Sequence, residues 1–402
     1  MNNNASSFSN QSTKTRNYGI DLLRLISMLM IVFLHVLGKG GILSSTKPLT
    51  LKGEIFWSIE ISCYCAVNIY AIISGYVGYK SAHKGRNLIS LCLQLIFFTL
   101  LITLLDVLYL CCHGESISLK SLFLNLFPTI KDYWYFSAYF CLFFFMPILD
   151  KVIDCVPRAT LKAVALFCFI VFCCWTQISS SVSSLREGYS VLWLGILYVL
   201  GAYVARYNPF EKWSKTFCFL GYFVCVLLTI ASKIAIGFAS KTLFGEIKYT
   251  TFLVSYLSPT ITLAALFLVC AFSKFTFRET VNKVISHLAP LSFGVYLIHC
   301  HPIVFSAMYN RFAWVSAKPI CFAVLLVIAI SLAIFIACMV LDWLRLQLFK
   351  VCKIKQFSIF LEGKIKKFIV FLLKIVRIRL EDEPFSEASA DDGLQQSSHS
   401  KS

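Results

Sequence analysis

Apolar runs long enough to cross a membrane recur from one end of this chain to the other. A helix needs about 20 residues to span a hydrocarbon core of about 30 Å, and about ten such runs can be read by hydropathy. Of the 402 residues, 58% are hydrophobic and 14% are charged, whereas about a quarter are charged in soluble domains. The sequence therefore predicts an all-α integral membrane protein, a bundle of about ten transmembrane helices at residues 20–38, 55–79, 88–112, 133–149, 160–178, 189–205, 216–239, 249–272, 287–307 and 319–348.

The charges near the C-terminus predict the orientation of this bundle. Between Arg345 and Arg379 the chain carries many Lys and Arg residues and one acidic residue, Glu362. The positive-inside rule holds such a segment in the cytoplasm. With an even number of crossings, both termini are expected to be cytoplasmic.

The composition divides the chain into four parts. Residues 1–17 are polar and lack a cleavage site, so we expect a disordered N-terminus and a first helix that is retained. Residues 18–348 form the transmembrane domain, and 349–380 form a basic amphipathic segment in the interface with membrane lipids. Residues 381–402 are acidic, Ser-rich and expected to be disordered. The net charge of +17 is thus a membrane-surface feature, and no nucleic acid partner is expected.

The cysteines show no pattern typical of a disulfide framework or a metal site. Most of the 17 cysteines lie inside apolar runs, where a thiol behaves as a small hydrophobic group. No repeated ligand spacing accompanies them. We therefore expect no metal.

Three ionisable residues, Asp21, Arg24 and His35, share the first apolar run. Arg24 and His35 are eleven residues apart, which places them within about 20° on one helix face and about 16 Å apart along the axis, and Asp21 within about 60° of Arg24. Buried charges are costly and are therefore functional candidates. The alternatives are that Asp21 and Arg24 anchor the helix end as an interfacial pair, and that His35 makes an interhelical hydrogen bond.

The second apolar segment adds Glu60, Asn68 and Ser74. In a helix that returns toward the cytoplasm, Glu60 lies at a depth that approaches His35. Asn68 and Gly75 share one face of this helix. Ser74 and Gly75 are equally typical of close packing between membrane helices.

Two further segments carry polar or aromatic groups. Histidines at 299 and 301 point to nearly opposite sides of a helix unless Pro302 opens the turn locally, and we favour His299 over His301 as the one that faces the bundle interior. The aromatic run at 133–135 is typical of a belt at the outer interface.

Taken together, these segments resemble the acyltransferase 3 family over residues 17–348. The resemblance is carried by RNYGIDLLRLISMLMIVFLH, with its Arg24 and His35, and by AVNIYAIISGYVGY, YWYFSAYFCLFFFMPIL and LSFGVYLIHCHPIV. It implies a multi-pass enzyme of the bacterial cytoplasmic (inner) membrane that moves acetyl groups from acetyl-CoA onto sugar hydroxyls of cell-surface glycans. It also implies that His35 is catalytic and that Arg24 contributes to donor binding. The basic stretch SAHKGRNL adds Lys84 and Arg86 to the expected donor site.

The chemistry expected from this resemblance needs a base, and neutral His is suited to that role near neutral pH. We predict His35 as general base with Glu60 as a second catalytic group, which orients His35 or binds a sugar hydroxyl. Asn68, Ser74 and His299 are the predicted substrate-binding residues, and His299 is also a candidate for stabilising the oxyanion.

Several alternatives stay open at the level of sequence. A covalent acyl-enzyme route is chemically allowed, and transfer is either direct or completed by a separate extracytoplasmic partner enzyme, since the chain carries no such domain. A transporter or flippase would also place ionisable residues in the membrane. A structural or sensing membrane protein with a polar core is the third class.

Overall fold

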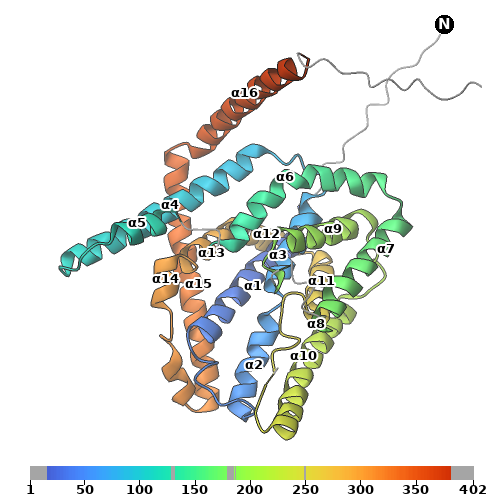
Figure 1. Cartoon of the computed structure of the whole chain (residues 1–402), viewed down its shortest axis with the longest axis vertical. Helices are drawn as coiled ribbons and strands as arrows, with labels where there is room; N and C mark the ends of the chain where they lie inside the picture. The colour runs from blue at the N-terminus through green and yellow to red at the C-terminus, as the bar shows by residue number, and fades with distance from the viewer. Residues whose placement is uncertain (1–15, 128–131, 179–184, 186, 249, 382–402) are drawn as a thin grey trace, which may run out of the picture.

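The computed structural model describes residues 16–127, 132–178, 185, 187–248 and 250–381, and this part of the chain is helical without strands. Figure 1 shows α1 running diagonally through the middle of the bundle. The helices are α1 (Tyr18–Leu34), α2 (Leu51–Cys63), α3 (Ala66–Gly78), α4 (Gly85–Cys112), α5 (Leu119–Leu126), α6 (Trp134–Cys155), α7 (Arg158–Cys168), α8 (Thr176–Ile178), α9 (Val191–Tyr207), α10 (Lys215–Phe244), α11 (Pro259–Ser273), α12 (Glu279–Leu288), α13 (Ser292–His299), α14 (Pro302–Ala307), α15 (Ile320–Val351) and α16 (Ile354–Glu381).

Eight helical segments in the described ranges are long and apolar enough to cross a membrane. Two further apolar helices, α9 and α11, are shorter. Large apolar side chains on the outside of the bundle are more than half exposed, among them Leu104, Phe144, Leu227 and Leu325. Contact with lipid tails accounts for so many exposed apolar side chains. The prediction of an all-α multi-pass membrane protein is confirmed, whereas ten crossings and the location of the termini stay predictions. The eight segments are Tyr18–Lys39, Leu51–Gly78, Gly85–Cys112, Trp134–Cys155, Arg158–Trp175, Lys215–Phe244, Glu279–His299 and Ile320–Val351.

The predicted run at 55–79 is divided between α2 and α3, and two further predicted spans differ more from the observed helices. The run at 249–272 is helical only from Pro259, because the described residues before it form turns and proline is favoured in the first turn of a helix. The run at 287–307 is divided between the end of α12, a 3₁₀ turn, α13 and α14. Pro302 begins α14, since its ring cannot continue the preceding helix.

Small residues allow α3 and α9 to pack at very short range. A Cβ added to Gly75 would lie 1.9 Å from the carbonyl oxygen of Tyr198, and one added to Gly201 would lie 2.0 Å from that of Ile72. Such close approach is the usual role of small residues between membrane helices. Gly75 is therefore a packing residue, which was one of the two interpretations of its sequence position.

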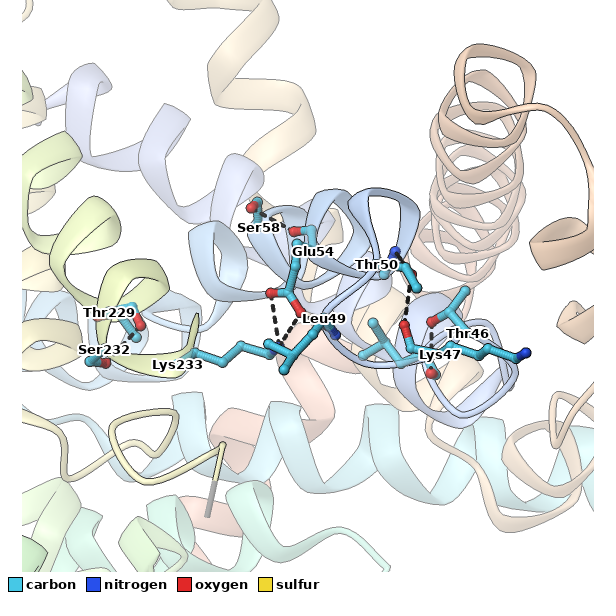
Figure 2. A network of polar contacts seen from close by, with 11 residues as sticks. Thr46, Lys47, Leu49, Thr50, Glu54, Ser58, Thr229, Ser232 and Lys233 are labelled. Atoms are coloured by element: carbon cyan, nitrogen blue, oxygen red, sulfur yellow. Dashed lines mark hydrogen bonds and ion pairs between the residues drawn. The ribbon is translucent and has the colours of Figure 1, made fainter. Parts of the chain in front are cut away.

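An ion pair fastens α10 to α2 (Figure 2). The Lys233 ammonium lies 2.9 Å from both carboxylate oxygens of Glu54, and the Lys233 side chain is 1% exposed. The ammonium also lies over the Trp57 ring, 4.9 Å from its centroid. The buried Lys233 charge is thus compensated by the Glu54 carboxylate, which a buried charge requires.

The C-terminal helix α16 packs against α4 rather than against the centre of the bundle (Figure 1). Glu362 of α16 accepts a hydrogen bond from Lys366 and lies beside Arg86, and these cations lower the pKa of Glu362. The predicted interfacial role of 349–380 stays a prediction. The two predicted disordered tails lie almost wholly outside the described residues.

Candidate active site

His35 and His299 meet inside the bundle. His35 opens a π-helical turn, His35–Lys39, at the end of α1, and such turns are frequent at functional sites. Its Nδ1 lies 3.0 Å from Nε2 of His299, the last residue of α13. The ring of Phe305 packs edge-on against His35 at 5.0 Å between centroids. His299 faces the interior as predicted, but His301 is also fully buried. The helix ends at His299 and a new one begins at Pro302, so the two histidines do not point to opposite sides of one continuous helix.

The hydrogen bonds of the two rings determine their tautomers when both are neutral. His299 Nδ1 lies 2.5 Å from the carbonyl oxygen of Val295. Because a carbonyl can only accept, His299 carries its proton on Nδ1 and its lone pair on Nε2. His35 must then donate from Nδ1 to His299 Nε2. This leaves the lone pair of His35 on Nε2, the nitrogen that a general base uses.

A cavity of about 470 Å³ borders His35, and we call it the His35 cavity. Met28, Ile31 and Leu34 of α1 form one part of its wall, and His35 and Lys39 of the π-helical turn continue it. Much of the remaining wall is aromatic and comes from distant parts of the chain, with Tyr70, Trp134, Tyr135, Tyr189, Tyr256, Phe293, Tyr296 and Phe305. An apolar, aromatic wall with few polar groups is typical of a small-molecule site.

The aromatic run 133–135 does not form an outer belt. Tyr133 is buried and donates from its hydroxyl to the carbonyl oxygen of Leu297 at 2.6 Å. Trp134 and Tyr135 line the His35 cavity. The belt prediction is wrong because these rings pack against α13 and the cavity instead of facing lipid.

A second cavity, of about 480 Å³, lies at the other end of the same α1 face, and we call it the Arg24 cavity. Its charged residues are Arg16, Asp21, Arg24 and Lys80. The Asp21 carboxylate is shared, at 2.5 Å from Arg16 Nε and 2.9 Å from Arg24 Nη1. Three cations therefore face one anion, which makes this cavity suited to an anionic ligand.

One helix face borders both cavities. Met28, Ile31 and His35 follow Arg24 at intervals of four, three and four residues, the spacing of a single helix face, and all three line the His35 cavity. The Tyr70 hydroxyl, on the wall of that cavity, donates to the backbone carbonyl of Arg24 at 2.9 Å. His35 and Arg24, predicted to share one helix face, thus line two separate cavities near its two ends.

Local contacts position the groups of the Arg24 cavity. Asn17 caps α1 by accepting from the backbone N–H of Ile20, and its amide donates to the carbonyl of Ser273 at the end of α11. The Asp150 carboxylate accepts from the backbone N–H of Lys80 and lies 2.8 Å from Nε2 of His83. The segment that carries Lys80 is thereby held against α6.

The predicted donor residues Lys84 and Arg86 lie outside the walls of this cavity. Lys84 is exposed and immediately precedes α4. Arg86 lies beside Glu362, as described above. Of the predicted cationic group, the structure places Arg24 in the cavity.

Glu60 is not brought into contact with His35. Within the described residues, His299 occupies the position at His35 Nδ1 that Glu60 was expected to take. Glu60 is buried in α2, and its Oε2 has no hydrogen-bond partner among the described residues.

Asn68 and Ser74 are engaged by the protein itself. The Asn68 amide donates to the carbonyl of Tyr256 at 2.7 Å and accepts from Trp193 Nε1 at 3.2 Å. Its side chain is fully buried, so these hydrogen bonds join α3 to α9 and to the segment before α11. Ser74 donates to the carbonyl of Tyr70 within its own helix. Substrate binding by either residue would require these bonds to break.

Sequence reasoning missed several residues that the structure brings to these cavities. Arg16 and Lys80 belong to the Arg24 cavity, and the His35 cavity gains Lys39, Asp132, Cys300 and Ser306. Cys300 Sγ lies 3.4 Å from His299 Nε2 and 3.7 Å from His35 Nδ1. Its place directly after His299 was the one available signal.

Comparison with known proteins identifies the family of this chain. The family model of the acyltransferase domain, Acyl_transf_3, matches residues 17–342, a range that contains the walls of both cavities except Arg16. No curated protein and no solved structure matches the chain. Because the family model covers most of the chain, the protein belongs to the acyltransferase 3 family and is a membrane acyltransferase.

Proposed function

We propose that this protein transfers an acetyl or similar short acyl group from acetyl-CoA to a hydroxyl of a cell-surface polysaccharide or lipid-linked glycan, with His35 as general base. The observation that carries the proposal is the position of the His35 ring, which is hydrogen-bonded on one side and borders a cavity. Its Nδ1 is held by His299, while the ring lies on the wall of the His35 cavity. That arrangement leaves Nε2 free to accept a proton from a hydroxyl group.

The reaction needs one proton to move twice. His35 Nε2 removes the proton of the acceptor hydroxyl as the oxygen attacks the thioester carbonyl. When the tetrahedral intermediate collapses, the C–S bond breaks and His35 returns the proton to the departing CoA thiolate. The imidazolium formed between these steps donates to His299 Nε2, and hydrogen bonds from a charged group are stronger than those from a neutral one.

The donor enters, in this proposal, through the Arg24 cavity. Acetyl-CoA carries several phosphate charges, and Arg16, Arg24 and Lys80 supply cations for them. The thioester end must then extend about 16 Å along α1 to reach His35. The shared helix face, with Met28 and Ile31 on its course, offers that route.

The acceptor is expected to occupy the aromatic part of the His35 cavity. Trp134 lies close to two further rings, Tyr189 at 4.6 Å and Tyr256 at 6.3 Å between centroids. The C–H faces of sugars pack well on such rings, because these rings offer flat apolar surfaces. We place the protein in the bacterial cytoplasmic membrane, where it works on its own or with an extracytoplasmic partner enzyme.

The test is transfer of labelled acetyl from acetyl-CoA to the glycan fraction of membrane vesicles. Vesicles with the intact protein should label the glycan, and vesicles with His35→Ala should lose the signal by about 10²- to 10⁴-fold, the usual contribution of a general base. His287→Ala is the matched control, since His287 is an exposed histidine of α12. Equal labelling by the His35 and His287 variants would refute the role of His35. Unlabelled glycan in vesicles that accumulate the glycan in their lumen would favour a transporter.

A further inference from the structure

Three side chains of the types that bind zinc converge beside the His35 cavity. They are His35, His299 and Cys300, and their candidate ligand atoms all lie within 4.8 Å of one another. His35 and Cys300 line the cavity, while His299 is fully buried behind them. We propose that this cluster is a binding site for a Zn²⁺ ion and that the bound ion inhibits acyl transfer.

The distances between the three atoms suit a tetrahedral ion. With Zn–N bonds of about 2.0 to 2.1 Å and a Zn–S bond of about 2.3 Å, tetrahedral angles separate two nitrogens by about 3.3 Å and a nitrogen from a sulfur by about 3.6 Å. His35 Nδ1 and His299 Nε2 are 3.0 Å apart, and Cys300 Sγ lies 3.4 and 3.7 Å from them. Shifts of a few tenths of an ångström would therefore complete three of the four coordination positions.

The surroundings also suit a metal site. His299 Nδ1 is bound to the Val295 carbonyl, an outer hydrogen bond that typically fixes the ring of a metal-binding histidine. Because His35 and Cys300 line the His35 cavity, an ion and a water ligand can reach the cluster from that cavity. A mixed imidazole and thiolate set selects Zn²⁺ or Cu⁺ over Mg²⁺ and Ca²⁺.

Metal binding would change the protonation of His35. The ion takes the Nδ1 lone pair, so the proton of the neutral His35 ring must reside on Nε2, while the Cys300 thiol loses its proton to solvent. His35 then has no lone pair facing an acceptor hydroxyl. The inhibition, unlike the binding, rests on the proposed role of His35 as general base.

The binding test uses the full-length protein in detergent micelles with Co²⁺ and Zn²⁺ as probes. The wild type should bind about one metal ion more than Cys300→Ser, and its Co²⁺ form should show a thiolate-to-cobalt absorption band that Zn²⁺ removes. Cys63→Ser is the matched control, because Cys63 and Cys300 are both 8% exposed and Cys63 lies outside the cluster. The control should keep the band.

Equal metal content in all three proteins, or a band that survives in Cys300→Ser, would overturn the site. X-ray absorption at the zinc edge of the wild type gives a second reading that needs no variant: one sulfur at about 2.3 Å among nitrogen or oxygen ligands at about 2.0 to 2.1 Å. A shell of nitrogen and oxygen alone would likewise overturn it.

The inhibition is then measured by acyl transfer. Free Zn²⁺ at ten times its Kd should lower the wild-type rate about elevenfold, as mass action requires, and a chelator should restore it. The acyl-transfer rate of Cys300→Ser, compared with the rate of the same variant without metal, should fall much less. Binding without a loss of rate, or a rate that rises with metal, would overturn the inhibition. Metal binding is read without acyl substrate, so a failure of the proposed function would leave the site itself testable.

Discussion

Replacing His299 by Leu should slow acyl transfer without preventing donor binding. His299 Nε2 lies 3.0 Å from His35 Nδ1. In the tautomers described above, it accepts a hydrogen bond from the His35 Nδ1–H group. Leu cannot accept a hydrogen bond, so His35 would lose both its orientation and the stabilisation of its imidazolium. Gln in the same place offers an amide oxygen and should retain part of the function.

The size of the effect follows from the bond that is lost. A hydrogen bond to a charged group contributes about 1.5 to 3 kcal/mol, and each 1.36 kcal/mol of barrier is a tenfold change in rate. His299→Leu should therefore lower kcat about ten- to a hundredfold, and His299→Gln should lower it less. Because His299 lies away from the Arg24 cavity, the KM for acetyl-CoA should change little in either variant.

The assay is steady-state transfer from labelled acetyl-CoA by purified protein in lipid nanodiscs. The order of activity expected is wild type, then His299→Gln, then His299→Leu. If the Leu variant is as active as the Gln variant, the hydrogen bond has no catalytic role. If both variants change KM and leave kcat intact, His299 acts on donor binding and the proposed roles are wrong.

Two further predictions concern the donor site and the stability of the bundle. Arg24→Ala should raise the KM for acetyl-CoA about ten- to a hundredfold, because it removes a charge-assisted hydrogen bond to the donor. Arg86→Ala should leave this KM unchanged. The reverse result would place the donor site at the start of α4. Lys233→Met should destabilise the protein by about 3 kcal/mol, because it leaves the Glu54 carboxylate, whose side chain is 15% exposed, without its cation. Adding Glu54→Gln should recover part of that loss in thermal unfolding, and no recovery would show that the two charges act independently.

The sequence predicted the features that are determined within a single helix, such as which residues share a face. Arg24 and His35 could be placed on one face because their separation is close to a whole number of turns. Helix boundaries failed where proline ends or begins a helix, as at Pro259 and Pro302. Apolar composition continues across such breaks, so hydropathy alone cannot locate them.

Contacts between distant segments could not be predicted from residue types. His299 and Cys300 meet His35 across 264 and 265 residues, and no spacing rule links them. Asn68 looked like a substrate-binding residue because a buried amide is costly, yet Tyr256 and Trp193 satisfy it. Tyr135 fits a membrane belt or a cavity wall equally well by composition, and the packing of α6 decides between them.

The most direct test of the account compares cell-surface and lipid-linked glycans by mass spectrometry in three strains. One strain carries the intact gene, one lacks it, and one carries His35→Ala at an equal level of membrane-inserted protein. The account predicts an acyl group on the glycan of the first strain that is missing from both others. Identical glycan masses in all three strains, or full acylation with His35→Ala, would contradict it.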